Sequence, residues 1–324
     1  MRRAPIAFIS TLQFFFAVDV AVFSEAFRQT RKLSSASIIQ KIRCGALAND
    51  DDEGGETTSS QNTSRTMYNK QATNWVRTEP RCLSDFTGRP VVFGMVAEEL
   101  VNKDKIVLDV GCGEGYCARK VVELGASMVV GSDISHEMIN SANNIADGDD
   151  RFCFYVCPVG ELIQGLKKRA VDIGIESLVG GFDVAMAVFL FNYLTSDDME
   201  DAIRQIFQAL KSGGIFVFSV PHPSMIFCHD KDAVFHLNSE GKGYYSSRNK
   251  KIFGQISTID GTKLNIMSVH KTVGDYINAI NAAGFHIVDI QETGVTEEHL
   301  ALHPEFFASV QDRPLHLVFK LKKP

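Results

Sequence analysis

The sequence predicts an α/β fold in which a doubly wound, seven-stranded, mainly parallel sheet is covered by helices on both faces. From Lys105 onward, short β-branched and apolar runs alternate with helical patterns. A glycine-rich turn separates the first such run from the first helical pattern, as in folds that bind a ligand where a strand leads into a helix. The 324 residues, 45% of them hydrophobic, suffice for one large domain with additional segments.

The individual elements follow from these patterns in chain order. Strands are expected at residues 105–111, 127–133, 151–156, 182–189 and 214–220. Helices are expected to begin near Gly115, Ser135, Glu161 and Ser196. A later helix at 272–285 and strands at 286–292 and 314–323 bring the sheet to seven strands.

A long segment after the fifth strand interrupts this alternation. Residues 222–269 are too many for a plain connection between two elements. Part of this segment, residues 241–264, alternates polar and apolar side chains between glycine-containing turns. The sequence therefore predicts a small antiparallel cap inserted at about 222–269.

Charge and cysteine content exclude several function classes. The formal net charge is −6, and residues 1–49 are basic, so the remaining chain is more acidic still. Such a body does not suit phosphate neutralisation on a nucleic acid. The seven cysteines are odd in number and form no CxxC pair, and the histidines show no ligand spacing, so we expect reduced thiols and no metal site.

The glycine turn "VLDVGCGEGY" raises a question of charge. Gly111, Gly113 and Gly115 would let backbone approach a ligand, but Tyr116 stands where a dinucleotide fingerprint has its third glycine. Asp109, two residues before the turn, would repel a pyrophosphate. It suits instead a cationic ligand that carries an adenosine, and Asp133 ends the next strand where an acid accepts hydrogen bonds from ribose hydroxyls.

The motifs "LDVGCGEG" and "VVGSDIS" resemble those of class I S-adenosylmethionine-dependent methyltransferases, in particular the small-molecule type 11 branch. The resemblance runs from about Tyr68 to the C-terminus and implies a Rossmann-like methyltransferase fold with S-adenosyl-L-methionine as cofactor. It implies that Asp109 approaches the methionine amino end and that Asp133 binds the ribose. The other cofactor-binding residues that we expect are Gly111, Cys112, Gly113, Gly115, Ile134, Met138, Val159 and Val188, with Tyr68 and Trp75 closing over the ligand.

The chain departs from the family pattern after the third strand. Pro158, in "VCPVGEL", replaces the acidic residue that often reads the adenine amino group, so a backbone group makes that contact or it is absent. The stretch after the fourth strand also lacks the (Asn/Asp)-Pro-Pro-(Tyr/Phe) pattern of enzymes that methylate a flipped base, which disfavours nucleic-acid substrates.

The acceptor is expected at the carboxyl ends of the fourth and fifth strands. His222, held between two prolines, is the leading catalytic candidate, as a base or as a hydrogen-bonding group, and Tyr193 is the second. The alternative for His222 is a histidine bonded to local backbone.

We therefore expect a methyltransferase for a small-molecule acceptor: an amine, a hydroxyl or a thioether sulfur, the last as in methylthio-hydroxy acids on the way to sulfonium osmolytes. Two alternatives stay open. One is a nicotinamide-dependent oxidoreductase, and the other is a non-catalytic S-adenosylmethionine-binding subunit.

Residues 1–66 are expected to form a targeting presequence and a disordered linker, and residues 67–324 the methyltransferase domain. Arg2 and Arg3 precede a mostly apolar stretch, and Ser24 to Ala26 are typical of a signal-peptidase site. The following basic, serine-rich segment resembles the transit part of the bipartite plastid presequences of algae with secondary red plastids. This predicts a plastid location, with the cytoplasm as the alternative.

The apolar stretch also bears on membrane attachment. Asp19 lies within it, and an acid there costs about 2.5–3.5 kcal/mol on membrane-insertion scales, so no stable membrane anchor is expected. The polar, acidic residues 49–66 hold too little apolar surface to order themselves.

Overall fold

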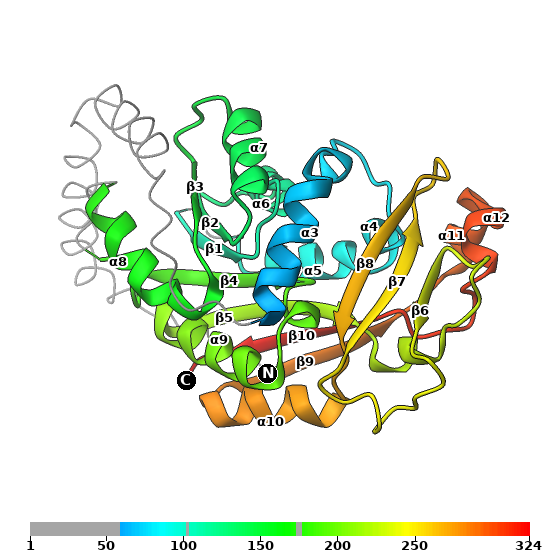
Figure 1. The fold of residues 1–324 in the computed structure, drawn as a ribbon. Coiled ribbons are helices and arrows are strands. Elements are labelled where there is room, and N and C mark those ends of the chain that lie inside the picture. Colours follow the sequence, from blue (N-terminus) through cyan, green and yellow to red (C-terminus); the bar gives the residue numbers. More distant parts are fainter. Residues whose placement is uncertain (1–58, 102–103, 173–176) are drawn as a thin grey trace, which may run out of the picture. The chain divides into compact units, whose positions relative to one another are not determined.

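The computed structural model describes residues 59–101, 104–172 and 177–324. The expected presequence and most of the expected linker lie outside these residues. The seven-stranded sheet is present, in the order β3-β2-β1-β4-β5-β10-β9 (Figure 1). Its strands are β1 Ile106–Val110, β2 Met128–Asp133, β3 Phe152–Val156, β4 Phe182–Val188, β5 Leu210–Pro221, β9 His286–Thr293 and β10 His316–Lys322.

Strand direction divides the sheet into two parts. β1 to β5 pair in parallel, whereas β10 is antiparallel to both β5 and β9. The central strands are buried on both faces, which explains their continuous apolar runs in place of an alternating pattern. The expected doubly wound, mainly parallel sheet is confirmed.

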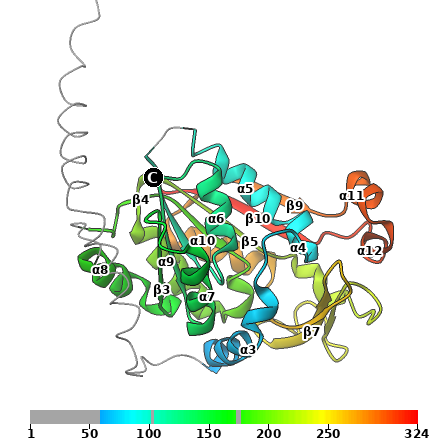
Figure 2. The ribbon, with the colours of Figure 1, turned by 90° about the horizontal axis from the view of Figure 1, so that it is seen from above.

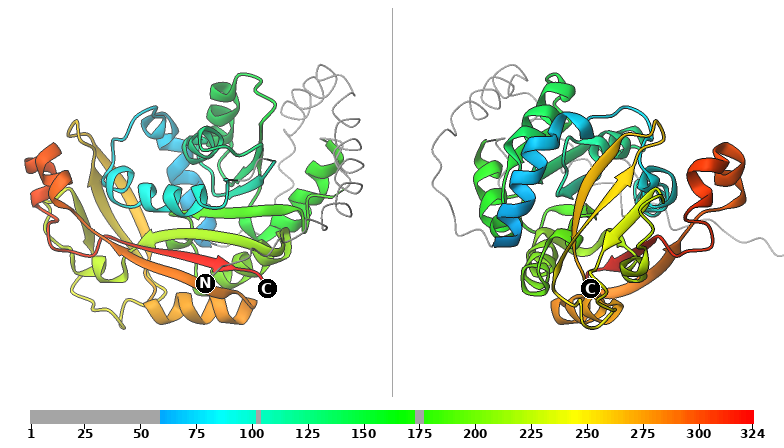
Figure 3. Two further views of the ribbon diagram at one scale, coloured as in Figure 1. Left: turned by 180° about the vertical axis from the view of Figure 1, so that it is seen from behind. Right: turned by 45° about the vertical axis from the view of Figure 1, so that its right-hand side comes forward.

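Helices cover both faces of the sheet (Figure 1). One face carries α5, α6 and α7, and the other carries α8, α9 and α10. Figure 3 shows the red and orange strands β10 and β9 between α10 and the cyan helices α4 and α5. The bounds are α4 Leu83–Thr87, α5 Arg89–Ala97, α6 Tyr116–Glu123, α7 His136–Ala146, α8 Leu162–Asp172, α9 Ser196–Ala209 and α10 Val273–Ala283.

The helix starts follow local capping chemistry. The Thr195 side chain accepts a hydrogen bond from the Asp198 amide at the start of α9, and two acids lie in the first turn of that helix. Ser135 caps α7 in the same way. Gly115 precedes α6 with a φ of 80°, in the left-handed region where a side chain would be strained.

Residues 223–269 form the expected antiparallel element. After the short helix η3 Pro223–Phe227, the strands β6 Phe235–Asn238, β7 Lys251–Ser257 and β8 Lys263–Val269 make a separate three-stranded sheet. We call this sheet the cap. It shares a hydrophobic cluster with α4 and with α12 Pro304–Ala308, which follows α11 Glu297–Leu302.

The N-terminal helix α3 spans Ser59–Trp75, so regular structure begins eight residues before the expected domain start at Met67. Composition missed this start because the helix is polar. It is ordered by docking: Gln61 and Ser64 are buried, and the Lys251 amine of β7 donates to the Thr63 hydroxyl at 3.0 Å. Figure 2 shows α3 between α7 and the cap.

Two searches of the described residues complete the fold. Every helix in residues 59–101, 104–172 and 177–324 is too short or too polar to cross a bilayer. The apolar stretch near the N-terminus lies outside that part of the chain. The same residues hold no cluster of three or more His, Cys, Asp or Glu side chains that could bind a metal ion.

Candidate active site

The candidate site lies at the edge of the sheet where the parallel strands end. Because β10 is antiparallel, its first residue, His316, lies at this same edge and pairs with Pro221, the last residue of β5. A cavity of about 170 Å³ occupies the edge, and we call it the main cavity. Its wall comes from the glycine turn, from residues 75–89, from the ends of β4, β5 and β10, and from the cap strands.

The glycine turn is held open by backbone conformation and by one carboxylate. Gly111, Gly113 and Gly115 have φ values of 74°, 56° and 80°, all in the left-handed region. The Asp133 carboxylate accepts from the Gly113 amide at 3.0 Å and from the Ser135 amide at 2.9 Å. Asp133 therefore ties the turn to the end of β2 and keeps backbone exposed to the cavity.

Asp109 is a buried acid without compensation. Its side chain is part of the cavity wall, the residue is 1% exposed, and Oδ2 has no hydrogen-bond partner among the described residues. Burial and the nearby Asp133 raise the pKa of Asp109 to about 8, although Arg89 acts in the opposite direction. A cation bound in the main cavity would supply the charge that this carboxylate lacks.

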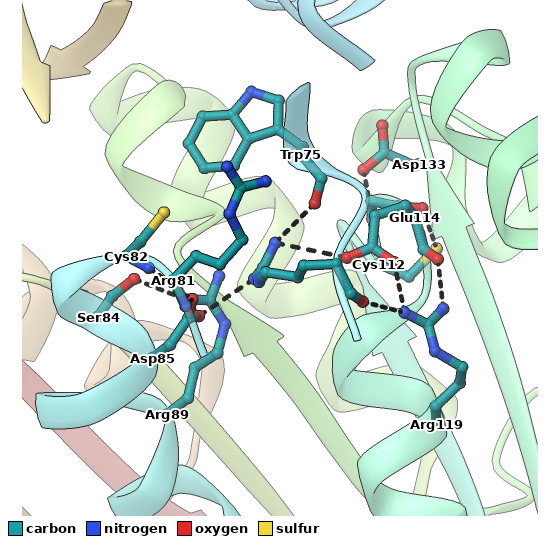
Figure 4. A network of polar contacts seen from close by, with 12 residues as sticks. Trp75, Arg81, Cys82, Ser84, Asp85, Arg89, Cys112, Glu114, Arg119 and Asp133 are labelled. Atoms are coloured by element: carbon teal, nitrogen blue, oxygen red, sulfur yellow. Dashed lines mark hydrogen bonds and ion pairs between the residues drawn. The ribbon is translucent and has the colours of Figure 1, made fainter. Parts of the chain in front are cut away.

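Residues 77–89 face the glycine turn with three arginines. Asp85 pairs with Arg89 at 2.8 Å and with Arg77 at 3.3 Å, and Arg77 reaches Glu114 of the turn at 3.4 Å. Arg119 of α6 closes the network on Glu114 at 2.6 Å, as the close-up shows (Figure 4). This network fixes the segment against the turn, and Arg77 also lies over the Tyr116 ring, 4.5 Å from its centroid.

A second cavity of about 80 Å³ adjoins the first, and we call it the side cavity. Ile134 and Val159 form part of its apolar wall. Tyr68 and Tyr193 line both cavities, and the Tyr68 hydroxyl donates to the Tyr193 hydroxyl, with the two rings edge to face. This tyrosine pair therefore stands where the two cavities meet.

Most of the residues singled out in the sequence come together here. The main cavity is lined by Tyr68, Trp75, Asp109, Gly111, Cys112, Gly113, Asp133, Met138, Val188 and Tyr193, and the side cavity by Ile134 and Val159. Gly115 begins α6 behind the turn and is not part of either wall. Asp109 and Asp133 lie on the same cavity, as a single charged site requires.

His222 lies elsewhere. Its ring borders a small separate cavity, where Nδ1 is 2.8 Å from the Ser224 hydroxyl and Nε2 is 2.7 Å from a Glu292 carboxylate oxygen. Neighbouring residues of an extended chain point to opposite sides, so Pro221 faces the main cavity and His222 turns away from it. The structure thus supports the alternative of a locally bonded histidine.

Sequence reasoning missed His316, Arg77 and Arg89, which all line the main cavity. His316 is 6% exposed, and burial, with Arg89 and His222 adding to it, lowers its pKa to about 3. One signal was available: the first residue of an antiparallel last strand lies level with the carboxyl ends of the parallel ones. The arginines carried no comparable signal, because an irregular segment brings them to the site.

Comparison with known proteins agrees with this geometry. A family model described as "Methyltransferase domain" matches residues 94–268. The chain is 24% identical to an uncharacterized protein of Haemophilus influenzae, over 76% of this chain and 91% of that protein. It is 26% identical to N-demethylindolmycin N-methyltransferase of Streptomyces griseus, over 68% of this chain and 86% of that enzyme.

Solved structures share the fold. An S-adenosylmethionine-dependent methyltransferase from Mesorhizobium loti superposes with a TM-score of 0.52 at 24% identity, covering 72% of this chain and 96% of that one. Magnesium protoporphyrin IX methyltransferase from Synechocystis, with bound S-adenosylhomocysteine, gives 0.53 at 13% identity, over 82% of this chain and 100% of that one. The [4+2]-cyclase SpnF gives 0.52 at 18% identity, over 84% and 99%, so this fold also occurs in a protein named for another reaction.

Proposed function

Because the chain belongs to a family of S-adenosylmethionine-dependent methyltransferases, we propose that it methylates a small molecule at a nitrogen, oxygen or sulfur atom. The observation that carries the proposal is the Asp109 carboxylate, buried beside the glycine turn with one oxygen unpartnered among the described residues. A buried charge of this kind favours a ligand of opposite charge. A nicotinamide dinucleotide would bring its pyrophosphate to the same turn, so the oxidoreductase alternative is disfavoured.

The residues fit the donor along its length. Ile134 and Val159 form an apolar wall suited to adenine, and Asp133 keeps lone pairs for ribose hydroxyls while it accepts two backbone hydrogen bonds. Asp109 faces the positively charged methionine end. The tyrosine pair stands between these two parts of the site.

S-adenosylmethionine, when bound, supplies a methyl group on a positively charged sulfur. The chain's own residues orient the acceptor and exclude water around that methyl group. Trp75, Phe189 and the cap residues Phe235, Ile256 and Ile266 line the main cavity with apolar surface. Orientation of two reactants in this way is worth about 7–11 kcal/mol of the barrier.

The acceptor is proposed to be small and to enter beneath the cap. The cap strands form one side of the cavity, which leaves no open groove for a polymer along that side. The similarity to an N-methyltransferase named for N-demethylindolmycin supports a small acceptor. A methylthio-hydroxy acid, precursor of a sulfonium osmolyte, stays within the proposed range.

Binding of the donor product tests the proposal. We expect S-adenosylhomocysteine to bind the full chain in calorimetry and Asp109→Asn to weaken that binding by about 30-fold, because a charge-assisted hydrogen bond is lost. Asp150→Asn, at an exposed position, is the matched control and should leave affinity unchanged. No heat with the wild-type chain would overturn the proposal.

Turnover is tested separately. Full-length protein with methyl-labelled S-adenosylmethionine should label at least one member of a panel of amines, phenols, alcohols and thioethers. Binding of the donor without any labelled product would favour the non-catalytic alternative.

The location is a second, independent proposal. We propose import into a plastid, on the basis of the signal-like and basic segments before residue 49. Residues 1–66 fused to a fluorescent protein should carry it into the plastid of an alga with secondary plastids. Diffuse cytoplasmic fluorescence would contradict this.

A further inference from the structure

His316 is the histidine that belongs to the main cavity. It reaches the sheet edge because β10 runs antiparallel to β5, and its ring lies 5.1 Å from the Phe189 ring, which borders both cavities. The residue is 6% exposed. Its surroundings are therefore those of the proposed acceptor chamber, next to the loop that follows β4.

The hydrogen bonds of His316 define which ring nitrogen carries the proton. Nε2 is 2.9 Å from the Thr87 hydroxyl oxygen, and that hydroxyl donates to the Leu83 carbonyl oxygen at 2.9 Å. A hydroxyl has one proton, so the Nε2–H group must be the donor to Thr87. Nδ1 is then unprotonated and carries a lone pair.

That lone pair has no partner among the described residues. A buried acceptor atom left without a hydrogen bond costs free energy, so a native protein retains one where a ligand satisfies it. Burial and the nearby Arg89 hold the pKa of the ring at about 3, which keeps the imidazole neutral near pH 7. The ring can accept a hydrogen bond there but is too weak a base to hold the proton.

We propose that His316 Nδ1 accepts a hydrogen bond from an N–H or O–H group of the methyl acceptor. The main cavity then selects acceptors that carry such a group over thioethers that lack one. This rests on the proposed function and narrows its acceptor range. The rest of the chamber is largely apolar on the cap side, where Phe235, Ile256 and Ile266 offer a neutral molecule contact but no hydrogen bond.

The test uses two probes of similar size, phenol with an O–H group and thioanisole without one. Full-length protein labelled with ¹⁵N-histidine is first saturated with S-adenosylhomocysteine. We expect the His316 Nδ1 resonance at an unprotonated position, shifted upfield by phenol and unmoved by thioanisole. In calorimetry, His316→Phe should weaken phenol binding about tenfold while thioanisole affinity changes less than about threefold.

Two further variants guard against a purely structural effect. His286→Phe, at an exposed position on β9, is the matched control and should change neither affinity. Thr87→Val keeps His316 but removes the partner of Nε2–H, so the proton should redistribute toward Nδ1 and the preference for phenol should shrink.

Several outcomes would overturn the inference. They are a protonated Nδ1 in the wild-type chain, no upfield shift with phenol, no phenol binding at all, or equal losses of both probes in His316→Phe. Absence of S-adenosylhomocysteine binding at the first step would instead refute the proposed function. The two failures are thus distinguishable.

Discussion

Residues 77–89 and the glycine turn face each other across the main cavity and treat buried charge in opposite ways. In the segment, Asp85 is paired with Arg77 and Arg89 and accepts two backbone amides, so its pKa is lowered despite burial. In the turn, Asp109 has an oxygen with no partner in the described part of the chain and a raised pKa. One carboxylate holds the structure together, and the other is kept for a ligand.

The largest expected effect comes from removing the structural acid. Asp85→Asn leaves two buried guanidinium groups without their carboxylate and should lower the free energy of unfolding at pH 7 by about 3 kcal/mol. Because the folded-state pKa is depressed, the wild-type advantage is present above the unfolded pKa of 3.8 and lost as pH falls below it. Denaturant unfolding at pH 7 and pH 3.5 measures both. Equal stability of the two proteins at pH 7 would contradict the assigned role.

Removing the binding acid should have the opposite sign. The folded-state pKa of Asp109 is raised from 3.8 to about 8, so the folded state holds the proton more tightly and wild-type stability falls as pH rises between these values. Asp109→Asn cannot ionise and should be more stable than wild type at pH 8.5 by about 2 kcal/mol without ligand. Thermal melts at pH 5 and 8.5 should show the gain only at the higher pH.

A smaller effect is a proton released on binding. If the cationic donor neutralises Asp109, the pKa of that carboxyl falls below 7, and up to one proton leaves the protein at pH 7. Calorimetry with S-adenosylmethionine in phosphate and Tris buffers, which differ in ionisation enthalpy, gives the proton count. Asp109→Asn should reduce it to zero, whereas an unchanged count would place the titrating group elsewhere.

The smallest effect is expected at His222. The residue borders neither the main nor the side cavity, so His222→Ala should leave kcat/KM for a labelled acceptor within about twofold of wild type. Steady-state kinetics decide it. A loss of 100-fold or more would return His222 to the chemistry.

The parts of the site that sequence predicted are those encoded over short distances. Asp109, the three glycines and Asp133 lie within 25 residues, on two consecutive strands and one turn, so their meeting follows from the βα pattern itself. The seven strands were predictable for the same reason, because their apolar runs record burial on both faces. The cap was recognised from the length of its segment and its alternation.

The parts that were missed depend on long-range placement. His316 and Pro221 become neighbours only through antiparallel pairing of strands that lie far apart in the chain. Arg77 and Arg89 reach the cavity through an irregular segment, and the first turns of α3 are too polar to signal burial. Helix α9 was expected to run to its glycines, yet it ends at Ala209 because Leu210 already belongs to β5.

The tyrosine pair limits how the chain can be shortened at its N-terminal side. Tyr68 belongs to the first described helix, yet its hydroxyl meets Tyr193 in the middle of the site. A processing protease that cut just before Ser59 would leave the whole helix in place. One that cut after Lys70 would deliver a stable sheet with its ligand chamber unroofed, so the position of maturation decides whether the product is an enzyme.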